Sequence, residues 1–264
     1  MISLILAAFV PSLILIAYVC FKDRLSPEPG RLLVKAFGLG MLSASASMLI
    51  SVPLLLIGVY TAEPVTVWDH FRVAFFGAGV PEELAKFAVL WLVLRRNPAF
   101  DEHFDGIVYA VCVGMGFAFV ENVGYLFQAG DAWIHAGIAR GLISVPGHYV
   151  FAILMGYYYS FAHFSMTDRR RNQILTLAAP ILAHTLFDWV LMVSDASEHQ
   201  FVSGILTFVF FYGFFQLQKL GHKDILAHLA NDAPSGGADD LGGSPYDIHV
   251  DIPTDIPDDT ASHS

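Results

Sequence analysis

Long runs of apolar residues, separated by short polar segments, dominate the chain from residue 2 to residue 219. A helix that crosses a bilayer needs about 20 consecutive, mainly apolar residues. Seven runs come near or above that length, so the pattern predicts an all-α bundle of about seven transmembrane helices. The predicted spans are residues 2–21, 34–60, 71–94, 105–128, 140–163, 172–194 and 201–219.

The composition agrees with a membrane protein. Of the 264 residues, 55% are apolar and only 14% are charged, and the mean hydropathy is +0.57. A soluble domain carries about 25% charged residues, so the deficit favours lipid as the solvent. The first run has no basic segment before it and no cleavage site after it, so we expect a retained helix rather than a signal peptide. No basic patch of the kind that binds nucleic acid is present, and we expect no such partner.

The lysines and arginines indicate which way the spans run. They gather in the segments after the first, third, fifth and seventh runs, and none occurs in 61–70, 129–139 or 195–200, which we expect to be loops. By the positive-inside rule, the N-terminus lies outside and the C-terminus lies in the cytoplasm.

The chain divides by composition into two parts. Residues 1–219 form the predicted transmembrane domain, with the candidate catalytic helices at about 71–194. Residues 231–264 hold eight aspartates and no lysine or arginine, among glycine, proline and serine. Such a segment cannot bury a core, so we expect residues 220–264 to form an acidic, disordered cytoplasmic tail.

Four carboxylates and two histidines fall inside the predicted spans, although charge in lipid is costly. A carboxylate at mid-bilayer costs roughly 2.5–3.5 kcal/mol, so these groups must share partners, water or a cation. Because neighbouring spans alternate in direction and each helical residue rises about 1.5 Å, four helices bring such a group to a similar depth, somewhat outside the midplane. We therefore expect one buried polar site, built from Glu82, Glu83, Glu121, His148, His184 and Asp188.

The spacing of these residues indicates how they pair. His184 and Asp188 are four residues apart and share one helix face; they could ligate one metal, or the aspartate could fix the histidine tautomer. Glu82 and Lys86 have the same spacing, so the lysine can neutralise one glutamate and leave the other as a general base. Histidine and carboxylate ligands around an open position are also how zinc activates water.

Each residue taken alone has a plainer structural interpretation. Lys86 could form only an intrahelical ion pair, and Asn122 could satisfy helix packing. Arg140 could extend to the outer interface, or it could pair with a site carboxylate. Either histidine could be an interhelical hydrogen-bond partner. The shared depth of the whole set favours a functional site over these separate explanations.

Motif searches narrow the chemistry. The chain has no H-E-x-x-H, no G-x-S-G-like serine turn within a span, and no pair of aspartates in the contexts of an intramembrane aspartyl protease. Five segments in order instead resemble the PrsW family of intramembrane proteases, relatives of the CAAX prenyl endopeptidase and bacteriocin-processing group. They are DRLSPEPGRLL after the first span, PEELAKF at 81–87, the block 104–125 containing FVENVGY, SVPGHYVFAILMGYY at 144–158 and HTLFDW at 184–189. The aspartate-rich tail departs from this pattern.

The resemblance implies a glutamate- and histidine-dependent endopeptidase in a bacterial cytoplasmic membrane. It would cleave a single-pass membrane protein near the outer face, as in site-1 cleavage of an anti-sigma factor. Carried over by motif, Glu82 or Glu83 would activate water, and Asp188 would support His184. The catalytic set expected from the motifs is Glu82, Glu83, Glu121, His148 and His184, with Lys86, Asn122 and Arg140 in support.

A metal and a metal-free centre both remain open for such an enzyme. A metal is favoured because four carboxylates need a cation and Lys86 supplies only one charge. The expected ion is Zn²⁺, with Glu121, His148, His184 and Asp188 as ligands.

A proton-coupled membrane transporter is the alternative function, because buried glutamate, histidine and lysine also suit a proton relay. Against it, the two halves of the chain show no inverted repeat, which many carriers have. A catalytically inert membrane scaffold is a third class. The sequence favours the peptidase.

Overall fold

The computed structural model describes residues 1–165, 168–196, 212 and 216, and this part of the chain contains helices and no strand. The predicted span 201–219 and the predicted tail 220–264 lie outside the described residues, apart from Tyr212 and Gln216, which are helical. The all-α prediction is therefore confirmed for the described chain.

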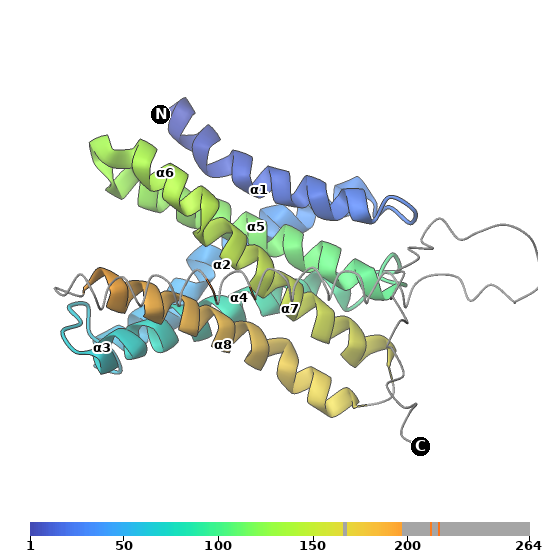
Figure 1. Ribbon diagram of the computed structural model, residues 1–264. Helices are drawn as coiled ribbons and strands as arrows, with labels where there is room; N and C mark the ends of the chain where they lie inside the picture. The colour runs from blue at the N-terminus through green and yellow to red at the C-terminus, as the bar shows by residue number, and fades with distance from the viewer. Residues whose placement is uncertain (166–167, 197–211, 213–215, 217–264) are drawn as a thin grey trace, which may run out of the picture. The chain divides into compact units, whose positions relative to one another are not determined.

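The helices pack as a bundle in which α5 lies among α1, α2 and α7, while α8 packs on α7 and on the segment that leads into α4 (Figure 1). In chain order the elements are α1 (Ile2–Lys22), α2 (Gly30–Leu56), α3 (Val67–Arg72), the π-helix η1 (Val73–Gly79), α4 (Val80–Leu94), α5 (His103–Gln128), the 3-10 helix η2 (Gly130–Ala132), α6 (Trp133–Leu142), α7 (Ser144–Phe164) and α8 (Arg169–Asp195).

Five helical stretches in the described chain are long and apolar enough to cross a membrane. They are Ile2–Lys22, Gly30–Leu56, His103–Gln128, Gly130–Phe164 and Arg169–Asp195. The predicted third span, 71–94, is also helical but is not among the five, and it carries Glu82, Glu83 and Lys86. The count of seven spans and their direction remain predictions.

The prediction of a loop at 129–139 is wrong, because η2 and most of α6 lie there. The apolar run 140–163 is in turn divided at Ile143, where the backbone leaves helical geometry with φ −120° and ψ −62°. Pro146, near the start of α7, explains this break. Its ring has no N–H and would clash with the carbonyl four residues earlier if one helix ran through both segments.

The prediction of a loop at 61–70 is wrong at its end, because α3 begins at Val67. The oxygen of the Thr66 side chain accepts a hydrogen bond from the Asp69 backbone N–H at 3.0 Å. The Asp69 carboxylate in turn accepts from the Thr66 N–H at 3.0 Å. This reciprocal capping box satisfies N–H groups that a helix start leaves unpaired, and the Thr66 hydrogen bonds hold the pKa of Asp69 below its usual range.

A π-helix leads from α3 into α4 and sets the position of the first glutamates. It ends at Gly79, where a Cβ atom would collide with the Thr185 hydroxyl of α8. Pro81 follows in the first turn of α4, where a missing N–H is tolerated. The close approach at Gly79 brings the start of α4 against α8, with Glu82 and Glu83 directly after it.

Small residues also let the central helix α5 approach its neighbours. A Cβ atom at Gly156 of α7 would collide with the Gly106 carbonyl and lie 2.7 Å from the Ile107 Cα atom, both in α5. A Cβ atom at Gly116 of α5 would collide with the Phe37 carbonyl in α2. Contacts of this kind are how membrane helices pack, since lipid provides no hydrophobic drive between them.

Gly156→Ala tests this packing. The added methyl group would force α5 and α7 apart, so we expect the free energy of unfolding to fall by roughly 1–3 kcal/mol. Gly124→Ala in α5 is the matched control, because a Cβ atom there meets nothing within 4 Å. Thermal unfolding in detergent measures both variants; equal midpoints would contradict the close approach.

Candidate active site

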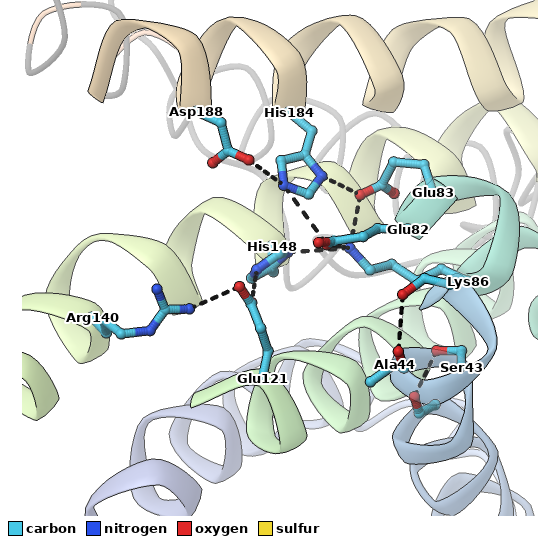
Figure 2. A network of polar contacts seen from close by, with 12 residues as sticks. Ser43, Ala44, Glu82, Glu83, Lys86, Glu121, Arg140, His148, His184 and Asp188 are labelled. Atoms are coloured by element: carbon cyan, nitrogen blue, oxygen red, sulfur yellow. Dashed lines mark hydrogen bonds and ion pairs between the residues drawn. The ribbon is translucent and has the colours of Figure 1, made fainter. Parts of the chain in front are cut away.

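The predicted site residues meet in one cluster of buried and partly buried side chains, which we call the site cluster; Figure 2 shows all of them except Asn122. Five helices contribute to it. Its members are Glu82, Glu83 and Lys86 of α4, Glu121 and Asn122 of α5, Arg140 of α6, His148 of α7, and His184 and Asp188 of α8.

Glu83 joins α4 to α8 at the centre of the cluster. Its side chain is 0% exposed, and one oxygen, Oε1, accepts a hydrogen bond from Lys86 Nζ at 2.8 Å and lies 2.8 Å from His184 Nδ1. The pairing predicted between Glu82 and Lys86 is thus the weaker contact, at 3.5 Å. Residues three and four apart on a helix are both neighbours, and here the shorter spacing makes the hydrogen bond.

Like Glu83 Oε2, one carboxylate oxygen of Glu82 is left without a hydrogen bond. Its Oε2 is buried and lies 3.8 Å from His184 Nε2 as well as 3.5 Å from Lys86 Nζ. The residue is 15% exposed, whereas Glu83 is fully enclosed. Of the two unbonded oxygens, the one on Glu82 therefore belongs to the partly exposed side chain, which a ligand or water can reach.

His148 lies between a cation and a carboxylate. Its Nδ1 is 3.2 Å from Lys86 Nζ, and its Nε2 is 2.6 Å from Glu121 Oε2. Since an ammonium group only donates, His148 Nδ1 accepts the hydrogen bond from Lys86. The other ring nitrogen, Nε2, faces the Glu121 carboxylate. His148 thereby connects α7 to both α4 and α5.

Arg140 holds Glu121 from the other side. Its guanidinium lies 3.0 Å from Glu121 Oε1, donates through Nε to Asn122 Oδ1 at 2.7 Å, and stands 3.8 Å from the centroid of the Tyr125 ring. Of the two positions considered for Arg140, the structure places it beside a site carboxylate. The short helix α6 is tied to the cluster through this side chain.

His184 is held by carboxylates on both ring nitrogens. Nδ1 faces Glu83, and Nε2 is 3.3 Å from Asp188 Oδ2. The ring also stacks on Phe151, with centroids 4.7 Å apart and planes at 20°. These contacts fix the orientation of the imidazole, as outer carboxylates do for metal-binding histidines.

Aromatic side chains around the cluster were missed by the sequence analysis. Besides Tyr125 and Phe151, the Phe117 ring lies 4.0 Å from Lys86 Nζ, in reach of a cation–π attraction. Helical spacing could have found all three, because Phe117 and Tyr125 lie four residues either side of Glu121, and Phe151 lies three after His148.

A metal ion would find ligands at Glu82, His148 and His184, whose ligand atoms all lie within 4.8 Å of one another. The predicted set of Glu121, His148, His184 and Asp188 differs from this group. Glu121 and Asp188 instead lie against the Nε2 atoms of the two histidines. Depth and spacing placed these side chains near the site, but which carboxylate meets both histidines depends on the rotation of each helix.

Charge balance and the unpaired oxygen both fit a divalent metal at this group. With neutral histidines, the four site carboxylates outnumber the two cations, Lys86 and Arg140, by two charges. Glu82 Oε2 is a buried acceptor without a hydrogen bond, and such atoms are rare in native proteins. A proton or a metal ion can bridge an imidazole nitrogen and a carboxylate, so the histidine contacts suit either.

Comparison with known proteins identifies relatives of the chain. The profile of the PrsW family intramembrane metalloproteases matches residues 28–215. Protease PrsW of Clostridioides difficile is 35% identical over 194 residues, covering 72% of this chain and 80% of that protein. Protease PrsW of Geobacillus kaustophilus is 33% identical over 195 residues, covering 74% and 82%. Protease PrsW of Bacillus subtilis is 32% identical over 222 residues, covering 83% and 94%. No solved structure matches the chain.

The matched range includes every residue of the site cluster. These relatives support a peptidase and give no support to the alternative of a proton-coupled transporter. The apolar helices are those of a multi-pass protein in a bacterial membrane. The chain belongs to the PrsW family of intramembrane proteases.

Proposed function

We propose that the site cluster hydrolyses a peptide bond of a membrane protein, with Glu82 accepting the proton of the attacking water. The observation that carries the proposal is the Glu82 Oε2 atom, buried without a hydrogen bond beside His184. A carboxylate with a free oxygen is what a general base needs. Glu83 is less suited. Its Oε2 also lacks a hydrogen bond, but the side chain is fully enclosed and its Oε1 is held by Lys86 and His184.

The ammonium group of Lys86 would stabilise the negative charge that develops on the scissile carbonyl oxygen. Its Nζ lies 3.5 Å from Glu82 Oε2. Cations held in advance where charge develops are worth far more in a water-poor site than in water. Lys86 also keeps Nδ1 of His148 as an acceptor, which directs Nε2 toward Glu121.

The remaining members of the cluster position these groups. Arg140 and Asn122 hold Glu121, and Glu121 orients His148. Asp188 and Glu83 orient His184. Preorganised geometry of this kind lowers the barrier because little reorganisation remains when the substrate binds.

We further propose that the enzyme is a zinc metalloprotease. His148, His184 and one carboxylate oxygen of Glu82 would hold the ion, a donor set found in other catalytic zinc sites. The second oxygen of Glu82 would then accept the proton of the water. A bound zinc ion supplies Lewis acidity and lowers the pKa of its water ligand. The family description as metalloproteases supports this assignment.

The substrate we propose is a single-pass membrane protein, such as an anti-sigma factor, cleaved near the outer face. The predicted direction of the spans and the depth of the site cluster support that position. We also propose that residues 1–219 form the membrane protease domain and that residues 220–264 form an acidic cytoplasmic tail.

Glu82→Gln tests the assignment of the base. The variant keeps the shape of the side chain and removes its charge, so we expect the cleavage rate to fall by about 10²–10⁴-fold, the usual contribution of general acid–base catalysis. Cleavage is measured in cells that also produce tagged single-pass membrane proteins, anti-sigma factors among them. Glu63→Gln, an exposed loop change, is the control. Cleavage by Glu82→Gln at the wild-type rate would sink the proposal.

Zinc content tests the metal separately. The full chain is purified in mild detergent without chelator or metal-affinity resin, and zinc per polypeptide is determined by elemental analysis. We expect near-stoichiometric zinc in the wild type and its loss in the His148→Ala/His184→Ala variant. His135→Ala, at an exposed position, should retain it. Zinc absent from well-folded wild-type protein would refute the metal and leave Glu82 acting without one.

A further inference from the structure

A pocket lies between the second half of α4, the end of α7 and the start of α8. Its volume is about 390 Å³, within the range of small-molecule sites in proteins. It is lined by Phe87, Trp91, Tyr159, Ala162, His163, Arg169, Gln173 and Thr176. We call it the basic pocket, after His163 and Arg169.

The basic pocket is separate from the site cluster. His163 lies fifteen positions after His148 in α7, and Arg169 lies fifteen positions before His184 in α8. At the helical rise of 1.5 Å per residue, each interval spans about 22 Å. The polar end of the basic pocket, at His163 and Arg169, is therefore far from the histidines of the proposed reaction, whereas Phe87 at its apolar end directly follows Lys86 in α4.

One side of the basic pocket is an apolar wall. Phe87 and Trp91 are four residues apart and share a face of α4, and Tyr159 and Ala162 face them from α7. Trp91 remains 44% exposed, whereas Ala162 is buried. The apolar wall is therefore accessible from outside at Trp91 and enclosed at Ala162.

The other side of the basic pocket offers hydrogen-bond donors and positive charge. Arg169 and Gln173 are four residues apart on α8, and neither side chain makes a hydrogen bond or ion pair with any described residue. His163 contributes a ring nitrogen, and the Arg95 guanidinium stands 4.7 Å from the centroid of the Trp91 ring. Among the described residues, no aspartate or glutamate lines the pocket. The pocket is therefore complementary to an anion.

The structure assigns to the basic pocket the headgroup of an anionic glycerophospholipid. The phosphate would lie at Arg169, His163 and Gln173, and the start of the acyl chains would lie along Phe87 and Trp91. A soluble phosphate would use only the donors and leave the aromatic wall without a partner, whereas a lipid uses both. Arg170 and Arg171 add charge at the same end of α8, and basic pockets between membrane helices bind such headgroups.

Quenching of Trp91 by brominated lipid tests this assignment. The full chain is reconstituted in vesicles of phosphatidylcholine and phosphatidylglycerol, in which one or the other lipid carries bromine on its acyl chains. The fluorescence quenching of Trp91 is obtained as the difference between the wild type and the Trp91→Phe variant under the same conditions. We expect phosphatidylglycerol to bind in preference to phosphatidylcholine, and Arg169→Gln to lower that preference about fivefold, as for one basic side chain at an anionic headgroup.

Arg171→Gln is the matched control, because it removes the same charge from the same exposed helix start outside the pocket lining. It should leave the preference at Trp91 unchanged. If both variants lost the preference for phosphatidylglycerol equally, the lipid would be attracted by the overall positive charge of the surface, and the proposed site would be overturned. Equal quenching by the two lipids would overturn it too, as would a Trp91 signal that responds to a single-pass substrate peptide and not to lipid.

Discussion

The buried carboxylate of Glu83 is the contact on which the rest of the site depends. Its Oε1 atom accepts a hydrogen bond from Lys86 Nζ of the same helix and lies against Nδ1 of His184 in α8, each at 2.8 Å. An unpaired charge in a water-poor interior costs several kcal/mol, so α4 and α8 cannot separate without that penalty. Lys86 and His184 hold the enclosed Glu83 in this way, whereas the adjacent Glu82 is partly exposed and offers its unbonded oxygen.

Close packing of the helices around α5 allows these charged side chains to contact one another. Glycines at the contacts of α5 with α2 and α7 bring helix backbones together, so that side chains from opposite helices meet within hydrogen-bond distance. His148 of α7 can then contact Lys86 of α4 and Glu121 of α5 at once. The polar groups compensate one another only because small residues elsewhere let the helices approach.

The three helices α4, α7 and α8 carry two different chemistries along their length. One end holds carboxylates paired with histidine, lysine and arginine, a combination suited to activating water. At the other end, the described lining of the basic pocket holds aromatic rings and cations and no acid, a combination suited to a lipid headgroup at the membrane boundary. A lipid bound there would contact the same helices that position the site cluster.

From the sequence alone follow the helical class, the position of most of the apolar helices and the set of polar residues that meet in one cluster. Helix rise and hydrophobic length are local properties, so they can be predicted without knowledge of the packing. Packing decided that Lys86 makes its hydrogen bond with Glu83 rather than Glu82, that Glu82 lies within ligand distance of both histidines, and that Arg140 reaches Glu121 from the separate helix α6. Spacing leaves positions three and four residues away equally close, and the rotation of each helix against its neighbours is set only when the whole bundle forms.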